Sequence, residues 1–418
     1  MYLRNMFFTE DTRRFILDHR LDDAVRLALL RDRYPGVDMP FALNQIQGWQ
    51  TARCKLPSWA ATEGILYPPH LNMEQCSSES TARYKAGLLE AAGGRTLVDL
   101  TGGFGVDFSF MARSCRRAVY VERNAQLCEL ARHNFSVLGL TQAEVVCSDA
   151  EDALRRLPVR SPGTDAPIIY LDPARRDTHG RRVFGIEDCT PDVAALRNEL
   201  LQRARTVIVK LSPMLDWHAA VRTLSAAGGV AVDVHIVSVA NECKELLLVL
   251  TRHEGLEADE MDVSLPSLPR RVVCANDGQQ FVCHPSATPR QPLLAAPDAR
   301  SSWLLVPNAS VMKAGCFAEL SHAFSLPQLD RDSHLFVSSA PVPAFPGRQF
   351  QILSISSMNK RELKQALAGI SQANIAVRNF PLSADELRRR LRLRDGGGTY
   401  VFATTWRSRH VVIVARRG

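Results

Sequence analysis

The chain has 418 residues, which is too long for one typical domain and suggests two to four domains. A hydrophobic content of 46% and a charged content of 23% are those of an ordinary globular protein, so disordered and fibrous classes are excluded. The net charge is +7, and residues 378–418 hold ten arginines, no lysine and three acids, so the whole excess lies in this last segment.

We expect no signal for export, membrane insertion or metal binding in this sequence. No apolar stretch approaches the roughly 20 residues that cross a bilayer, and the charged residues among the first twenty exclude a secretory signal. The ten cysteines are single, with no C-x-x-C pair, which indicates reduced thiols rather than disulfides or a zinc site. We therefore expect a cytoplasmic protein with no membrane contact and no metal.

Residues 1–76 are predicted to form an N-terminal helical domain. Apolar residues recur at helical spacing through residues 9–33, so one helix is expected there. Thr9 is its expected N-cap, and the turn at 34–36 ends it.

Seven apolar runs between residues 77 and 253 predict the strands of an α/β sheet. They are residues 96–100, 118–121, 144–147, 168–171, 206–211, 232–239 and 245–251. Segments long enough for crossover helices separate the first five runs, which indicates parallel strands. Only five residues separate the last two runs, so these strands are expected to pair antiparallel.

The remaining chain is predicted to form two smaller α+β domains, at 254–340 and 341–418. The first is rich in proline, with short strands at 271–274, 280–283 and 303–306. The second is predicted as strand 350–355, helix 359–369, strand 375–378, helix 384–393 and strands 400–405 and 410–415.

The strongest chemical signal is a glycine-dense turn directly after the first strand, Asp99-Leu-Thr-Gly-Gly-Phe-Gly105. Glycines at such a turn let the backbone approach a ligand closely. A dinucleotide fingerprint needs another glycine where Phe108 stands, and the carboxylates of Asp99 and Asp107 would repel a pyrophosphate. The turn therefore favours a ligand with a ribose, a positive charge and no phosphate, such as S-adenosylmethionine.

Acids at the carboxyl ends of the predicted strands support this ligand, because α/β sheets bind ligands at that edge. Glu122 would bridge the ribose hydroxyls, and Asp149 would accept the adenine amino group. The residues predicted to bind S-adenosylmethionine are Thr81, Asp99, Thr101, Gly102, Gly103, Gly105, Asp107, Glu122, Arg123, Asp149, Ala150, Asp172 and Pro173.

Motifs along nearly the whole chain carry a family resemblance. They are Asn44-Gln-Ile-x-Gly48, Lys55-Leu-Pro-x-Trp59, Glu74-Gln-Cys-Ser-Ser-Glu79, Asp99-Leu-Thr-Gly-Gly-x-Gly105, Leu171-Asp-Pro-Ala-Arg-Arg176, Lys210-Leu-Ser-Pro213, Asn241-Glu-Cys-Lys-Glu-Leu246, Pro307-Asn-Ala-Ser310 and Asp395-Gly-Gly-Gly398. With these the chain resembles class I S-adenosylmethionine-dependent methyltransferases, and more closely the bacterial family with an N-terminal helical domain and a C-terminal THUMP-like domain. The resemblance implies a seven-stranded Rossmann-like sheet, a ferredoxin-like module and a terminal domain that handles RNA, such as tRNA or rRNA.

The motif at the end of the fourth predicted strand helps to judge which atom of the substrate is methylated. Base N-methyltransferases look similar at Asp172-Pro173 but continue with proline and a stacking aromatic, where this chain has Ala174 and Arg175. That departure weakens a base N-methylation reading. Arg175 and Arg176 instead offer contacts to phosphate.

A second interpretation uses Lys85, Asp172, Lys210 and Glu245 as the catalytic set. Their positions resemble the Lys-Asp-Lys-Glu set of ribose 2′-O-methyltransferases, in which a lysine lowers the pKa of a hydroxyl. A structural lysine–aspartate pair at the strand ends explains the same residues, so both readings stay open.

The C-terminal domain carries five closely spaced arginines, Arg388, Arg389, Arg390, Arg392 and Arg394. Cations near the C-terminus of a helix interact favourably with the helix dipole, and these arginines lie at the end of a predicted helix. Five arginines are more than this interaction explains. We interpret them as a surface that binds the RNA backbone.

The sequence therefore predicts an S-adenosylmethionine-dependent methyltransferase acting on RNA. A non-catalytic protein that senses S-adenosylmethionine and binds RNA, and a small-molecule methyltransferase, are the alternatives. The target nucleotide, the choice between base and ribose, and the oligomeric state do not follow from the sequence.

Overall fold

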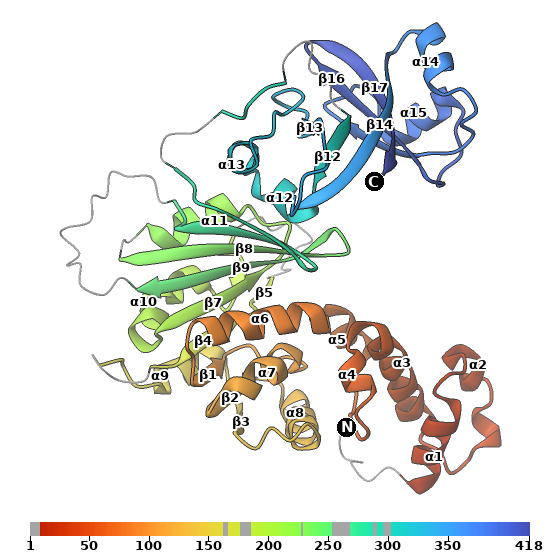
Figure 1. Cartoon of the computed structure of the whole chain (residues 1–418). Coiled ribbons are helices and arrows are strands. Elements are labelled where there is room, and N and C mark those ends of the chain that lie inside the picture. Colours follow the sequence, from red (N-terminus) through yellow and green to blue (C-terminus); the bar gives the residue numbers. More distant parts are fainter. Residues whose placement is uncertain are drawn as a thin grey trace. The chain divides into compact units, whose positions relative to one another are not determined.

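The computed structural model describes residues 9–161, 166–175, 185–226, 229–252, 268–286, 291–295 and 302–418. The chain divides into two compact units (Figure 1). The first comprises residues 1–232 and 245–267, and the second comprises residues 233–244 and 268–418.

The first unit begins with a group of helices. They are α1 (Glu10–His19), α2 (Ala24–Ala28), α3 (Met39–Lys55), α4 (Pro57–Ala60) and α5 (His70–Gln75), with a 3-10 turn at Arg31–Arg33. Thr9 caps α1 by accepting a hydrogen bond from the Thr12 amide, as predicted.

The prediction of one helix through residues 9–33 is wrong, because the helix ends at His19. Asp23 accepts hydrogen bonds from the Val25 and Arg26 amides and so starts a separate helix, α2. Phe15 and Leu27 are buried, whereas Val25 is 71% exposed, so the apolar stripe does not follow one continuous face. The local aspartate cap outweighs the helical periodicity here.

The sheet of the first unit has five parallel strands and one antiparallel strand, in the order β3-β2-β1-β4-β7-β9. This confirms the predicted α/β architecture. Its strands are β1 (Thr96–Asp99), β2 (Arg117–Glu122), β3 (Ala143–Cys147), β4 (Ile168–Leu171), β7 (Thr206–Leu211) and β9 (Glu242–Arg252). The flanking helices are α6 (Glu79–Ala91), α7 (Val106–Met111), α8 (Ala125–Val137), α9 (Ala150–Arg156), α10 (Val193–Arg203) and α11 (Trp217–Ser225), with a 3-10 turn at Ala112–Ser114.

A short two-stranded ribbon, β5 (Ala174–Arg175) with β6 (Cys189–Thr190), follows β4. β8 (Val230–Val239), the sixth predicted strand, crosses the border between the two units. In the second unit β8 pairs in parallel with β10 (Arg271–Asn276), which pairs antiparallel with β11 (Gln279–Cys283).

The second unit also contains a six-stranded sheet in the order β13-β12-β14-β17-β16-β15. Its strands are β12 (Trp303–Pro307), β13 (Phe336–Ser338), β14 (Gly347–Ser357), β15 (Asn374–Arg378), β16 (Thr399–Trp406) and β17 (Arg409–Arg417), and its helices are α12 (Ala309–Ala314), α13 (Phe317–Ala323), α14 (Lys360–Ala366) and α15 (Ala384–Leu391). β12 pairs with β14, so this sheet combines strands from both sides of residue 341.

Helices α14 and α15 lie on the same face of this six-stranded sheet. Leu363 of α14 and Leu387 of α15 pack in one apolar cluster with Val401 and Ala403 of β16. Phe350 and Phe402 belong to a second cluster, on the other face, together with Leu329, Leu335 and Val337. In the described part of the chain, none of the helices has the length and apolar character needed to cross a membrane.

Asn134 joins the N-terminal helices to the sheet of the first unit. This α8 residue is fully buried, and its side chain accepts from the Leu66 amide and donates to the Leu66 carbonyl, both at 2.9 Å. A side-chain amide thus replaces a backbone partner for the segment that follows α4.

Replacing Asn134 with alanine should lower the free energy of unfolding by about 2–4 kcal/mol, because two buried backbone groups lose their partners. Urea denaturation followed by circular dichroism measures this loss. Ser136→Ala, at an exposed position on the same helix, is the control and should change the midpoint little. Equal midpoints for both variants would contradict the assigned role of Asn134.

Candidate functional site

The glycine turn after β1 is shaped by its neighbours. A Cβ atom on Gly102 would lie 2.2 Å from the ring of Tyr120, so only glycine fits there. Gly105 has a φ of 81°, in the left-handed region that favours glycine, and begins α7. The turn therefore presents backbone rather than side chains at the carboxyl end of β1.

Glu122 lies at the end of β2, beside this turn. One carboxylate oxygen accepts from the Gly103 amide at 2.9 Å and the other from the Asn124 amide at 2.8 Å. Two backbone amides thus orient the carboxylate that was predicted to hold a ribose. Arg123, the next residue, is exposed.

Asp149 and Ala150 follow the next strand, β3. Glu122 and Cys147 are register partners in the parallel pair, so the two strands end side by side. Asp149 occupies the N-cap position of α9, but its carboxylate makes no capping hydrogen bond. This exposed carboxylate therefore remains able to accept a bond from a ligand.

Asp99 is the most enclosed acid of the group, with 1% of its surface exposed. It accepts a hydrogen bond from the Thr101 amide at 2.9 Å. Burial raises the pKa of Asp99 well above its ordinary value, and the nearby carboxylates of Asp107, Asp172 and Glu122 raise this pKa further. The Thr101 hydroxyl accepts from the Asp172 amide at 2.6 Å and so joins the ends of β1 and β4.

Lys85, on α6, has no exposed surface and lies between two carboxylates. Its Nζ atom is 2.5 Å from Glu245 and 3.1 Å from Asp107. Ser77 and Tyr170 complete this network by donating hydrogen bonds to Asp107, each at 2.8 Å. Neither hydroxyl was predicted to have a role, although Ser77 lies in the motif at residues 74–79 and Tyr170 lies in the predicted strand 168–171.

The network keeps Asp107 ionised. Burial acts to raise the pKa of Asp107, but Lys85, Lys210 and the hydroxyls of Tyr170 and Ser77 lower it more, so the net pKa falls below its ordinary value. Thr81, another predicted ligand residue, is buried in the first turn of α6 and hydrogen bonds to Ser78.

Lys210 and Asp172 form the accessible charge pair of the site. Nζ of Lys210 is 2.5 Å from the Asp172 carboxylate, and their side chains are 13% and 39% exposed. Burial acts to lower the pKa of Lys210, but the carboxylates of Asp172, Asp107 and Glu245 raise it more, so this lysine stays a cation. The four predicted catalytic residues thus form two pairs, and only the Lys210–Asp172 pair has exposed surface beyond a few per cent.

The segment after Asp172 follows an ordered path. Pro173 is buried, and the backbones of Ala174 and Arg175 pair with Thr190 and Cys189. Arg176 lies outside the described residues. The short ribbon β5–β6 therefore occupies the place in the chain where base methyltransferases have their aromatic residue.

Carboxylates outnumber cations in the site. Among the described residues its acids are Asp99, Asp107, Glu122, Asp149, Asp172 and Glu245, against the cations Lys85, Lys210 and Arg123. Even with Asp99 protonated, the excess charge is negative. Such a site fits a ligand that carries a positive charge beside an uncharged nucleoside. Among the described residues no group of three or more histidine, cysteine or acidic side chains could hold a metal ion.

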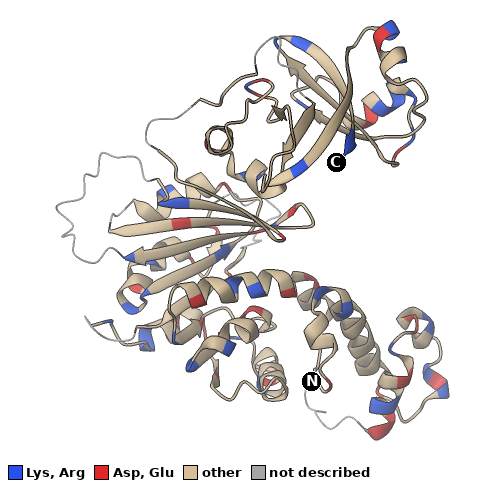
Figure 2. Ribbon diagram, in the orientation of Figure 1, with Lys and Arg blue, Asp and Glu red and all other residues tan. Residues whose placement is uncertain are grey.

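The five predicted RNA-binding arginines lie at the end of α15 and just after it (Figure 2). Arg388, Arg389 and Arg390 form its last turn, and Arg392 is its C-cap. Arg394 follows and is exposed.

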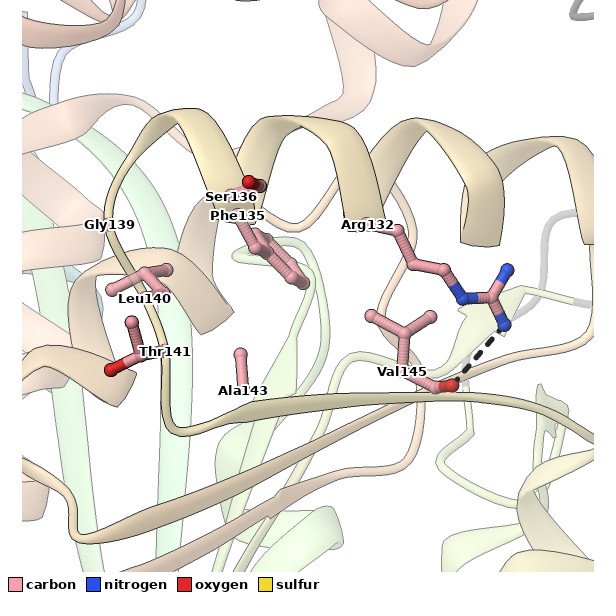
Figure 3. A pocket seen from close by; sticks show the side chains of 8 residues that line it. All are labelled: Arg132, Phe135, Ser136, Gly139, Leu140, Thr141, Ala143 and Val145. Atoms are coloured by element: carbon pink, nitrogen blue, oxygen red, sulfur yellow. Dashed lines mark hydrogen bonds between the residues drawn. The ribbon is translucent and has the colours of Figure 1, made fainter.

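A separate cavity of about 380 Å³ lies between α8 and β3 (Figure 3). Arg132 lines it and donates to the Val145 carbonyl at 3.3 Å. The cavity adjoins Ala143 and Val145 in β3 and contains no acid, whereas Asp149 follows the opposite end of that strand. We therefore distinguish it from the site at the glycine turn.

Two family models match the C-terminal part of the chain. A ferredoxin-like domain matches residues 303–346, and a THUMP domain-like model matches residues 347–417. These matches confirm the two domain types predicted for this part.

The chain is also similar over most of its length to known proteins. It is 26% identical over 324 residues, 77% of this chain and 80% of the relative, to an uncharacterized S-adenosylmethionine-dependent methyltransferase found in Mycobacterium tuberculosis strains CDC 1551 and H37Rv. A crystal structure from Porphyromonas gingivalis W83, of a protein classed as a methyltransferase, is 30% identical, with a TM-score of 0.80 over 98% of this chain and 97% of that one. The glycine turn, the oriented glutamate and the excess of carboxylates fit the cofactor of these relatives. The chain therefore belongs to the S-adenosylmethionine-dependent methyltransferases that carry ferredoxin-like and THUMP-like domains.

Proposed function

We propose that this methyltransferase acts on RNA and methylates a ribose hydroxyl. We choose a hydroxyl as the methylated group because of the Lys210–Asp172 pair at the carboxyl ends of β7 and β4. A base amino group needs a free carboxylate or carbonyl to hold it, and the Asp172 carboxylate is already bound to Lys210. A lysine held as a cation instead favours the ionised form of a hydroxyl.

S-Adenosylmethionine, when bound, supplies an electrophilic methyl group on a positively charged sulfur. Glu122 and Asp149 would hold the nucleoside through its hydroxyls and amino group, and the glycine turn would keep side chains away from it. The negative field of the acids stabilises the positive charge before transfer. Ser77 and Tyr170 maintain that field because they keep Asp107 ionised.

The proposed reaction breaks the hydroxyl O–H bond and the S–CH₃ bond of S-adenosylmethionine and forms an O–CH₃ bond, so that S-adenosylhomocysteine leaves and one proton is released. Lys210 stabilises the developing negative charge on oxygen, and the Asp172 carboxylate takes up the released proton. Lys85 and Glu245 have almost no exposed surface, so we assign them the role of positioning Asp107 rather than contact with substrate.

RNA as the substrate rests on the C-terminal domain. The THUMP domain-like match and the excess of arginine in residues 378–418 both support a polyanionic partner. Transfer of labelled methyl groups to total RNA tests this, and alkaline hydrolysis separates ribose from base methylation, because a 2′-O-methyl group blocks cleavage of the next phosphodiester. Label in the small-molecule fraction would favour the small-molecule alternative.

Lys210→Met should reduce methyl transfer by about 10²–10⁴-fold, because the hydroxyl loses the cation that favours its ionisation. The affinity for S-adenosylmethionine, measured by calorimetry, should change far less. Lys244→Met, at a surface lysine that pairs with Glu242, is the matched control and should keep full activity. Equal turnover by both variants would remove Lys210 from the reaction.

Asp99→Asn should stabilise the free protein at neutral pH and weaken cofactor binding. The folded state holds a proton on Asp99 above the ordinary aspartate pKa of about 3.9, so stability falls as pH rises towards the raised pKa. Asparagine removes that penalty, so its advantage in melting temperature should grow with pH. The affinity for the cationic cofactor should fall most at high pH, where the wild-type Asp99 ionises and asparagine stays neutral.

Melting temperatures between pH 5 and 8 check the predicted gain in stability. Calorimetry at each pH checks the predicted loss of affinity for the cofactor. Asp152→Asn, at an exposed aspartate, is the control and should show no such trend. A variant less stable than the wild type at every pH would contradict the assignment for Asp99.

A further inference from the structure

The THUMP-like domain is far more basic than the rest of the chain. Residues 347–417 contain 14 lysines and arginines but four acids. The ferredoxin-like domain before it, residues 303–346, contains two cations and three acids. Electrostatic repulsion among these cations disfavours the compact state. Folding alone therefore does not explain why the domain carries so many of them.

Two of the four acids are used to cap helices. Glu362 accepts from the Ser357 amide at 2.9 Å, just before α14. Glu386 forms a capping box with Ser383 at the start of α15. Neither glutamate forms an ion pair within 4 Å in the described part of the chain.

The other two acids, Asp385 and Asp395, both pair with Arg388, at 2.5 and 2.7 Å. The Arg388 side chain is 24% exposed and joins the first turn of α15 to the loop after it. Arg388, predicted to contact RNA, therefore has a structural role, and all four acids are engaged.

The remaining cations of the two helices have no acid partner within 4 Å among the residues that the structure describes. On α14 they are Lys360, Arg361 and Lys364, and at α15 they are Arg389, Arg390 and Arg392; all six are exposed. Figure 2 shows basic positions on both helices. Since both helices pack on one face of the sheet through Leu363 and Leu387, their outer sides form one layer, which we call the helical layer.

Helix stability does not explain this arrangement. Lys360 and Arg361 lie in the first turn of α14, where the helix dipole disfavours positive charge. Arg392 has a φ of 57°, a conformation that glycine adopts more easily. These cations therefore stand at positions that cost stability, unlike Arg389 and Arg390, which suit the dipole.

We propose that the helical layer binds the phosphate backbone of structured RNA through Lys360, Arg361 and Lys364 of α14 together with Arg389 and Arg390 of α15. This inference rests on the proposed function and identifies how the substrate is held. Neither helix contains an aromatic residue, so the layer offers phosphate contacts rather than an aromatic stacking surface, and we expect it to read the backbone without sequence preference. The α14 residues add a second helix to the arginines that the sequence indicated.

The test measures binding of full-length protein to fluorescently labelled total tRNA across a series of salt concentrations. Arg361→Ala/Lys364→Ala and Arg389→Ala/Arg390→Ala should each reduce the slope of log affinity against log salt by about 1 for every phosphate that is no longer neutralised. The matched control is Arg409→Ala/Arg417→Ala, which removes two exposed cations from β17. The control should leave the slope unchanged, and melting temperatures verify that all variants fold.

An equal loss of affinity in the control would show that net charge, not the helical layer, sets affinity, and would overturn the proposal. So would an unchanged slope in both helical variants, or equal affinity for duplex DNA of the same length. Methyl transfer is measured in parallel. Salt-dependent tRNA binding through the helical layer without methyl transfer would refute the proposed activity but support the proposed RNA-binding surface. Methyl transfer that neither helical variant changes would refute the proposed surface alone.

Discussion

Electrostatic repulsion between carboxylates is the constraint on which the site depends. Neighbouring parallel strands end at one edge of the sheet, and Asp99, Glu122 and Asp172 meet there. Three features reduce this repulsion: a raised pKa favours the neutral form of Asp99, Glu122 binds two backbone amides, and Asp172 pairs with Lys210. The remaining negative charge makes the edge receptive to a cationic nucleoside.

The segment between the N-terminal helices and the sheet contributes to the same balance. Ser77 and Lys85 lie before β1 in the chain and reach Asp107 after it. A buried lysine without partners would be costly, and two carboxylates with a serine hydroxyl offset that cost. The helical segment therefore sets the charge state of the cofactor site, in addition to covering part of the core.

The THUMP-like domain has the opposite balance of charge, with more cations than acids. Its few acids bind backbone amides before two helices or pair with Arg388, while most of its cations are exposed. An acidic site suited to a cation and a basic surface suited to phosphate are thus kept on separate units of one chain.

The sequence by itself determined the α/β sheet, the glycine turn, the acids at the strand ends and most elements of the C-terminal domain, because hydrophobic periodicity and glycine placement are local signals. Only the tertiary structure decided that Lys85 and Lys210 have different partners, that Ser77 and Tyr170 support Asp107, and that α14 lies on the same face as α15. It also separated α1 from α2 through the Asp23 cap. These contacts join residues far apart in the chain or balance competing local preferences, and no spacing along one sequence encodes which side chain a buried charge will meet.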